Sequence, residues 1–261
     1  MRLAILSIQS NKHYEAAHGI KTPINFQSHH ISQIFLHFLR SSHQPEPDGS
    51  GRLTVLFEEP PERYFRLRED DVKYRESGLL IAFHQTAEGC GLYVRDGYFH
   101  VSEYYVGEET RRRAEHLKPE ERNAFYLAVL MQAFRAMAEA NHWSETQWDA
   151  VEQAARQVEA CGFSLTLPVK KLSGSSADRR YRAAVYRQLD GAGELWTVEI
   201  TEKGDKKNKT PPTTTRYEIM EQPTFITLID KYKTSRWEGH CFLMEDRLGN
   251  VTASVDAEAG K

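Results

Sequence analysis

Residues 119–160 read PEERNAFYLAVLMQAFRAMAEANHWSETQWDAVEQAARQVEA, and this stretch sets the fold class of the chain. Apolar residues recur at helical spacing before and after the polar segment near Asn141, which predicts two helices. Pro119 and the two glutamates that follow it are typical of a helix N-terminus. Ser144 and Gln147 have the spacing of a capping box at the start of the second helix. We therefore expect an antiparallel helix pair in the middle of the chain.

Segments with strand character lie on both sides of this helix pair. On the N-terminal side a further helix is predicted over 29–40, with Ser28 as its N-cap. Asp96-Gly97 stands between two alternating segments, which indicates a hairpin with a two-residue turn. The predicted strands cover 1–8, 53–57, 79–84, 91–95, 98–106, 163–169, 182–189, 194–202, 216–220, 225–229, 240–245 and 251–255.

Together these elements predict an α+β fold, in which two strand-rich lobes of mainly antiparallel sheet flank a central antiparallel helix pair. The expected domains are an N-terminal α+β lobe (1–118), a helical hairpin (119–160) and a C-terminal antiparallel β lobe (161–261). No segment repeats at a fixed period, so the pattern does not indicate a repeat protein.

The composition is that of an ordinary globular protein and excludes several classes. The chain has 261 residues, is 40% hydrophobic and 27% charged, and carries a net charge of −3. These values exclude collagen-like, coiled-coil and fully disordered chains. No apolar run reaches the roughly 18–20 residues that a membrane-spanning helix needs, and the first residues lack the long apolar core of a signal peptide. We expect a cytoplasmic protein that does not engage a membrane.

Cysteine and histidine spacing favours neither a disulfide framework nor a metal site. The three cysteines, Cys90, Cys161 and Cys241, are widely spaced and form no CxxC motif. Histidines are concentrated in the N-terminal region, but not at the i, i+4 spacing that holds one ion on a helix. His240 precedes Cys241, and on a regular strand their side chains would face opposite ways. Since no glycine-rich phosphate loop is present either, we expect no metal and no cofactor.

The pattern His-x-Ser/Thr is more frequent than chance would give. It begins at His30, His84, His100 and His142, four occurrences where the residue frequencies predict about one. On a strand, residues i and i+2 share a face, so the imidazole and the hydroxyl project into one cleft. Two such pairs could supply a general base, a general acid and hydroxyls that bind phosphate.

These motifs resemble the motif pair of the two-histidine phosphoesterases, which cleave RNA-type phosphodiesters and cyclic phosphates. The resemblance covers only the short motifs, and His84 and His100 are closer in sequence than the two motifs of that family. It implies a histidine-dependent phosphodiesterase with His84, His100 and Ser102 in catalysis. His84 and His100 are predicted on neighbouring strands, as such a site requires.

Charge is unevenly distributed along the chain. Residues 169–217 contain eleven basic and six acidic residues, a net +5, so the rest of the chain carries −8. Aromatic residues lie among the basic ones, and such a sheet could bind single-stranded nucleic acid by phosphate contact and stacking. The candidate nucleic-acid-binding residues are Arg179, Arg180, Arg182, Lys206, Lys207 and Lys209. No RNP, KH or helix-turn-helix motif accompanies them, and a solvated loop on a mixed surface explains the same pattern.

Acidic clusters in the first half of the chain carry the main functional hypothesis. Glu58, Glu59, Glu69, Asp70 and Asp71 could meet a basic partner protein or mimic nucleic acid. Because the chain has a sizeable core and no catalytic signature, we expect a non-enzymatic protein-binding protein that acts through charged surfaces. Bacterial toxin-immunity proteins and other inhibitors have this character, although no residue motif links the chain to them. The alternative is a phosphodiesterase, or an RNA-processing or RNA-binding protein, that uses the His-x-Ser/Thr pairs and the basic C-terminal sheet.

Overall fold

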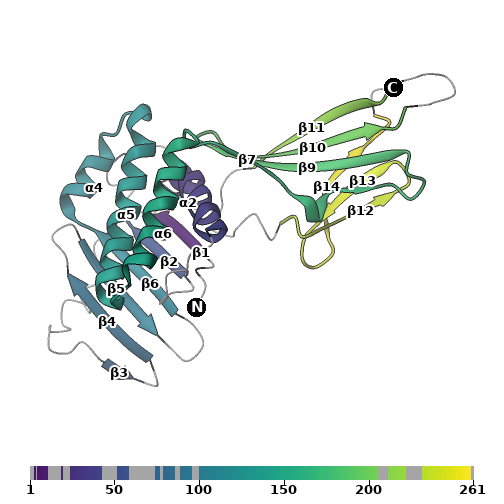
Figure 1. Cartoon of the computed structure of the whole chain (residues 1–261). Coiled ribbons are helices and arrows are strands. Elements are labelled where there is room, and N and C mark those ends of the chain that lie inside the picture. The colour runs from purple at the N-terminus through teal and green to yellow at the C-terminus, as the bar shows by residue number, and fades with distance from the viewer. Residues whose placement is uncertain are drawn as a thin grey trace. The chain divides into compact units, whose positions relative to one another are not determined.

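A parallel β-α-β unit begins the fold. β1 (Ile5–Gln9) and β2 (Arg52–Leu56) pair in parallel, and α2 (Ile24–Ser41) lies between them in the chain and packs on β1 (Figure 1). Parallel neighbours require such a crossover because the chain must return to the starting edge before the second strand. Ile31 and Ile34 of α2 are fully buried, as the helical spacing of the apolar residues predicts.

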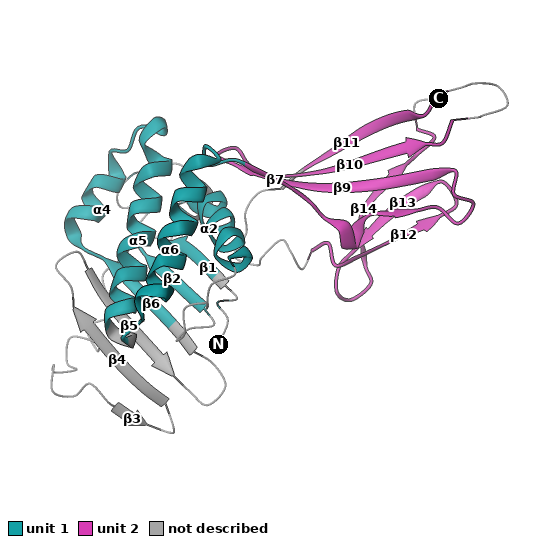
Figure 2. Ribbon diagram, in the orientation of Figure 1, with its two compact units in different colours: residues 1–164 teal, residues 165–261 magenta. Residues whose placement is uncertain are grey.

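The chain forms two compact units, Met1–Ser164 and Leu165–Lys261 (Figure 2). The computed structural model describes residues 3, 5–10, 19, 24–42, 52–58, 74–76, 79–85, 89–95, 100–204, 211–221 and 231–259, and only the backbone of the strand residues between 74 and 101. The helical segment predicted over 119–160 lies in the first unit. The strand predicted over 225–229 lies outside the described residues.

Within the described residues, the sheet of the first unit has six strands in the order β1-β2-β6-β5-β4-β3. β2 pairs in parallel with β6, whereas β6-β5, β5-β4 and β4-β3 are antiparallel. The predicted β5–β6 hairpin is confirmed, but Arg95 pairs with His100, whereas a two-residue turn at Asp96-Gly97 would pair Arg95 with Tyr98, so the predicted turn length does not match the register. Residues 96–99 lie outside the described part. The remaining strands are β3 (Tyr74–Glu76), β4 (Leu79–Gln85), β5 (Gly89–Arg95) and β6 (His100–Val106).

Three further helices follow the sheet strands: α4 (Glu108–Glu115), α5 (Arg122–Asn141) and α6 (Glu145–Ala160). α5 packs on the sheet, and α6 packs on both α2 and α5. Phe35 of α2 stacks on Phe134 of α5 with 5.0 Å between ring centroids. With four α-helices and three mostly antiparallel sheets in the described part, the predicted α+β class is confirmed. None of the helices described is long and apolar enough to cross a membrane.

The predicted start of the first helix is wrong. α2 begins at Ile24, and Ser28 lies inside it with no exposed surface. The Ser28 hydroxyl donates to the carbonyl oxygen of Ile24 at 2.8 Å and lies 3.2 Å from that of Ile8. A serine within a helix can bond to the carbonyl four residues earlier instead of capping the N-terminus. The serine therefore links α2 to β1 from within the helix.

Ser144 caps α6, as the sequence predicts. Its backbone N–H donates to Gln147 Oε1 at 2.9 Å, and its Oγ accepts from the Gln147 N–H at 3.4 Å. We expect Ser144→Ala to lower the free energy of unfolding by about 1 kcal/mol, because one helix N–H then loses its acceptor. Urea unfolding followed by circular dichroism measures this loss. The control is Gln153→Ala at an exposed position of α6; an equal loss in both variants would contradict the capping role.

Two antiparallel sheets build the described part of the second unit (Figure 1). The first has the order β11-β10-β9-β7, with the short β8 paired to β9, and the second has the order β12-β13-β14. The hairpin predicted over 240–245 and 251–255 is confirmed as β13–β14, whereas the sequence did not predict β12. The strands are β7 (Leu165–Pro168), β8 (Gly174–Ser175), β9 (Tyr181–Asp190), β10 (Gly193–Glu202), β11 (Thr213–Glu221), β12 (Thr234–Glu238), β13 (Cys241–Glu245) and β14 (Val251–Asp256).

Apolar residues from both sheets form one core in this unit. Trp196 and Val198 of β10 are buried, as their alternation predicts, and they belong to the same cluster as Phe242 of β13. The Trp196 ring lies 4.8 Å from the ring of Tyr232, measured between centroids. Burial of such large aromatic rings contributes strongly to the hydrophobic stabilisation of this core.

A buried ion pair lies beside this core. Glu194 is 0% exposed and Arg187 is 8% exposed. The Arg187 guanidinium donates to both carboxylate oxygens of Glu194, from Nε at 2.6 Å and from a terminal nitrogen at 2.7 Å. The indole Nε1–H of Trp196 donates to the same carboxylate at 2.8 Å. This bidentate geometry with a third donor offsets the cost of removing the two charges from water.

Asp246 organises the turn between β13 and β14. Hydrogen bonds from the side chain and backbone N–H of Asn250, followed by the N–H of Leu248, hold the pKa of Asp246 below its usual value of 3.8. A carboxylate with a depressed pKa stabilises the folded state above its unfolded pKa, and this contribution disappears as the pH falls through the folded value. Gly249 adopts a φ of 83°, which favours glycine in this turn.

We expect the melting temperature of the wild type to fall more steeply than that of Asp246→Asn as the pH drops from about 5 to about 2. Asparagine cannot ionise, and its one amide oxygen can still accept from the backbone N–H groups of Leu248 and Asn250, although the bond from the Asn250 side chain is lost. Differential scanning calorimetry across this pH range measures the two slopes. Parallel slopes would show that the Asp246 carboxylate does not contribute to acid sensitivity.

Candidate functional site at the turn between α5 and α6

The end of α5 and the start of α6 enclose an open pocket of about 800 Å³. α5 contributes Arg135 and Glu139, which are one helical turn apart on one face. α6 contributes Glu145, Trp148, Asp149 and Glu152, spaced at i, i+3, i+4 and i+7, so these residues also share one face. Two stripes of side chains, one from each helix, therefore line the pocket.

The turn that joins the helices is fixed by backbone hydrogen bonds. His142 adopts a left-handed conformation with φ 52° and ends α5. The N–H of Trp143 donates to the carbonyl oxygen of Ala138 at 3.0 Å, and the N–H of His142 donates to that of Glu139 at 3.4 Å. These two bonds define a Schellman motif, and histidine is one of the non-glycine residues enriched in this conformation. Because the turn is so tight, the end of α5 and the start of α6 border the same pocket.

Two half-buried tryptophans lie in the pocket. The ring of Trp143 packs near the buried ring of Phe134, with 6.3 Å between centroids, so the turn is anchored to the core. The indole N–H of Trp148 donates to Glu152 Oε1 at 2.9 Å. The guanidinium carbon of Arg135 lies 5.7 Å from the centroid of the Trp148 ring, which is the geometry of a cation–π contact. The rings are therefore held in place before any ligand binds.

Negative charge dominates the pocket. Four lining carboxylates, from Glu139, Glu145, Asp149 and Glu152, stand against one guanidinium, from Arg135, which leaves a net charge of −3 with His142 neutral. Arg156, outside the lining, contacts Glu152 at 3.4 Å and offsets part of this charge. A concave surface lined by one sign of charge concentrates its field and attracts counter-charged groups. The pocket can therefore bind a cation that also stacks on an aromatic ring.

The structure separates the histidines of the catalytic hypothesis. β5 lies between β4 and β6, so the strands of His84 and His100 are not neighbours in the sheet. The register pairs His84 with Gly91 and His100 with Arg95. With strands about 4.8 Å apart and a rise of about 3.3 Å per residue, the two Cα atoms lie roughly 16 Å apart. Because the side chains of both histidines lie outside the described part, their catalytic role stays a prediction.

Several other members of the His-x-Ser/Thr pattern are buried in the fold or cap helices. Ser102 of β6 has no exposed surface. His30 is buried in α2, with its Nε2 at 2.9 Å from Asn123 Oδ1. His142 and Ser144 are the C-cap of α5 and the N-cap of α6. A substrate phosphate cannot reach a hydroxyl that has no exposed surface, so the geometry of Ser102 does not favour the catalytic hypothesis.

Among the predicted nucleic-acid-binding residues, the structure describes the three arginines. Arg179 and Arg182 are exposed. Arg180 donates to Glu202 Oε1 from two nitrogens, at 2.9 and 3.1 Å, and lies 3.3 Å from Glu258. The hydrogen bond to Glu202 raises the pKa of the Arg180 guanidinium above the usual value of arginine. Lys206, Lys207 and Lys209 lie outside the described residues, so a basic surface on this sheet stays a prediction.

Of the predicted protein-binding acids, the structure describes only Glu58, which is half-buried after β2. Glu59, Glu69, Asp70 and Asp71 lie outside the described residues. The acidic surface that the structure does show, at the turn between α5 and α6, contains none of the predicted residues. One sequence signal could have found it: Glu145, Trp148, Asp149 and Glu152 form an acidic and aromatic stripe at helical spacing, opposite the buried face of α6.

One group of three side chains that could hold a metal ion occurs within the described residues, formed by His240, Cys241 and Asp256 in the second unit. This group is separate from the pocket in sequence and belongs to the other unit. Comparisons with protein-family models, with curated proteins and with solved structures find no match to the chain.

Proposed function

We propose that the chain is a non-enzymatic protein-binding protein, and that its acidic, tryptophan-lined pocket at the α5–α6 turn receives an arginine side chain of a basic partner protein. One observation carries the proposal: four carboxylates and two tryptophans surround a single open pocket whose only lining cation is Arg135. The proposal keeps the protein-binding hypothesis of the sequence but moves its site from the acidic clusters of 58–71 to residues 135–152.

The chemistry of the pocket favours arginine over lysine. A guanidinium is planar, weakly hydrated, and able to donate to several carboxylate oxygens at once. It also stacks on the face of an indole, as Arg135 does over Trp148 in this molecule. A lysine ammonium is a compact and strongly hydrated charge, so it gains less from the ring and loses more on leaving water.

An inhibitor or immunity-like role would follow from this chemistry. A partner protein whose basic surface binds nucleic acid or another polyanion needs its arginines exposed. A protein whose acidic pocket receives such an arginine of the partner covers the partner's basic surface. The opposite charges of the two proteins also make their association fast. This supports the choice of a basic partner protein, with inhibition as the consequence of binding.

Peptide titrations test the proposal. Arginine-rich, lysine-rich and glutamate-rich peptides of equal length, free of tryptophan, are added to the full chain at low salt, and tryptophan fluorescence is recorded. We expect the arginine-rich peptide to bind most tightly, the lysine-rich peptide more weakly and the glutamate-rich peptide not at all. Binding of the arginine-rich peptide should weaken as salt is raised, because exposed charges are screened.

The same titration is carried out with a single-stranded RNA in place of the peptides. If the RNA binds at low salt and the arginine-rich peptide does not, the protein-binding proposal is overturned in favour of the nucleic-acid alternative. Equal affinity for the arginine-rich and glutamate-rich peptides would also overturn it, since the acidic pocket would then have no part in binding.

A further inference from the structure

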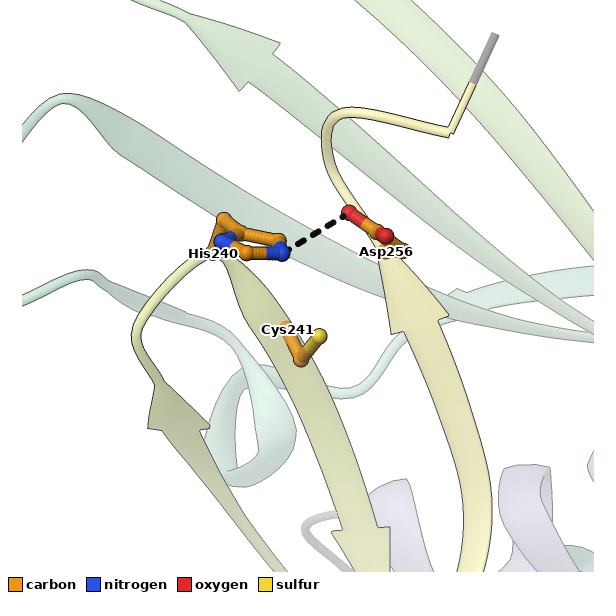
Figure 3. A group of neighbouring side chains, drawn as sticks. All are labelled: His240, Cys241 and Asp256. Carbon is orange, nitrogen blue, oxygen red and sulfur yellow. Dashed lines mark ion pairs between the residues drawn. The ribbon is translucent and has the colours of Figure 1, made fainter.

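Three potential metal ligands converge at one end of the three-stranded sheet in the second unit. Cys241, the first residue of β13, is paired directly with Asp256, the last residue of β14. Directly paired residues on antiparallel strands present their side chains on the same face of the sheet. Figure 3 shows His240 placed beside this pair, with its ring extended toward Asp256.

The hairpin turn explains why the sequence expectation for His240 fails. Glu238 pairs with Cys241, so Gly239 and His240 form a two-residue turn, and Gly239 has a positive φ of 58°. Glycine at the first central position is the pattern of a type II′ turn. His240 therefore precedes the strand, and the alternation that would place it opposite Cys241 does not apply. The carbonyl oxygen of His240 also accepts from the N–H of Ala257 at 3.0 Å, which holds the turn against the end of β14.

The ligand atoms are close to the separation that a single ion requires. The Cys241 Sγ, one ring nitrogen of His240 and one carboxylate oxygen of Asp256 all lie within 4.8 Å of one another. His240 Nε2 and Asp256 Oδ1 are 3.6 Å apart. Around a tetrahedral zinc ion, with metal–ligand distances of about 2.0–2.3 Å, ligand atoms lie about 3.5 Å apart. The three ligand atoms, at most 4.8 Å apart, therefore need to draw together by only about 1 Å to share one ion.

The donor set selects the class of metal. A thiolate is a soft ligand, an imidazole suits zinc and neighbouring transition metals, and a carboxylate completes many zinc sites. Calcium and magnesium prefer oxygen ligands only, so they are disfavoured here. His240 is exposed and the other two residues are half-buried, so an ion can enter from solvent.

Neighbouring hydrogen bonds already orient the carboxylate. The N–H of Glu258 donates to Asp256 Oδ1 at 2.8 Å and so orients the carboxylate, while the Tyr217 hydroxyl donates to the Asp256 backbone carbonyl oxygen at 2.8 Å and holds the main chain of this residue. Such outer contacts fix the ligand orientation in metal sites and strengthen binding.

We propose that His240, Cys241 and Asp256 bind one zinc ion, with the remaining coordination position open to water or to a group of a partner. Three protein ligands and one open position are the arrangement of zinc sites that stay accessible, in contrast to the four protein ligands of closed structural sites. The site is independent of the pocket on α5 and α6, so either proposal can fail without the other.

Zinc titration of the full chain, produced without a histidine tag, tests this site. Competition with a chromophoric chelator gives the stoichiometry and affinity. We expect one zinc ion per chain, and Cys241→Ser, His240→Gln and Asp256→Asn should each weaken binding by more than about 100-fold, since losing a ligand costs more than losing an outer contact. Cys161→Ser is the matched control, because Cys161 is the other described free cysteine and lies at the end of α6.

Cobalt substitution supplies a second readout that reports the thiolate directly. The cobalt-loaded chain should show a sulfur-to-cobalt charge-transfer band, and this band should vanish in Cys241→Ser but persist in Cys161→Ser. His240→Gln lies in an exposed turn, so it preserves the fold for the comparison. Absence of stoichiometric zinc binding by the wild type, or unchanged zinc affinity in Cys241→Ser, would overturn the proposal.

Discussion

Replacing Glu194 by alanine is expected to lower the free energy of unfolding of the second unit by about 3–5 kcal/mol, because it leaves a buried charge without its partner. Arg187 is 8% exposed, and its guanidinium makes two hydrogen bonds to the Glu194 carboxylate. The variant also removes the acceptor of the Trp196 indole N–H. A buried donor that is left without an acceptor costs roughly 1–3 kcal/mol of folding free energy in addition to the lost hydrogen bond.

Urea unfolding followed by tryptophan fluorescence measures this loss, in a background with Trp143→Phe and Trp148→Phe so that the signal comes from the second unit. The matched control replaces both partners, as Arg187→Leu with Glu194→Leu, because two apolar side chains leave no buried charge behind. We expect the double variant to be clearly more stable than Glu194→Ala alone. If the two are equally destabilised, the ion pair is not the origin of the effect.

Replacing Trp148 by alanine is expected to weaken binding of the arginine-rich peptide about 30-fold, which corresponds to about 2 kcal/mol, the loss typical of an aromatic hot-spot residue. Trp148 lines the pocket with Arg135 over its ring, and its indole N–H donates to the Glu152 carboxylate. The substitution therefore removes the stacking surface and releases one of the four carboxylates. Fluorescence anisotropy of a labelled peptide measures the change.

Charge variants provide the control for this prediction. The double change Glu145→Gln with Asp149→Asn should weaken binding about tenfold and reduce its dependence on salt, because surface charge contacts contribute up to about 1 kcal/mol each. Glu159→Gln removes a charge from an exposed position of α6 outside the pocket lining and should leave the affinity unchanged. Equal losses for Glu159→Gln and the double variant would show that net charge, and not the pocket, governs binding.

Local signals in the sequence predicted much of the fold. The capping box at Ser144, the alternation through Trp196 and the β13–β14 hairpin around Gly249 each depend on neighbouring residues, and each is present in the structure. Such features are encoded by spacing alone, since a helix repeats every 3.6 residues and a strand every two. The α+β class followed from them.

The features that the sequence did not predict depend on contacts between distant residues. Ser28 looks like an N-cap, but Ile24 is buried and extends the helix by one turn before it. His240, Cys241 and Asp256 meet only because β13 and β14 pair in one particular register. The pocket on α5 and α6 is lined by residues from two helices joined by a tight turn, and the stripe on α6 does not by itself show which residues of α5 lie beside it.

The indole signals of the four tryptophans provide the most direct test of the arginine pocket. The chain is labelled with ¹⁵N-tryptophan, and the indole N–H resonances are followed as the arginine-rich peptide is added. Two tryptophans, Trp143 and Trp148, line the pocket, whereas Trp196 and Trp237 belong to the second unit. We predict saturable shifts of the Trp143 and Trp148 signals with the other two unchanged. Saturable shifts confined to Trp196 and Trp237, or no shift of any signal at peptide saturation, would contradict the assignment of the pocket as the binding site.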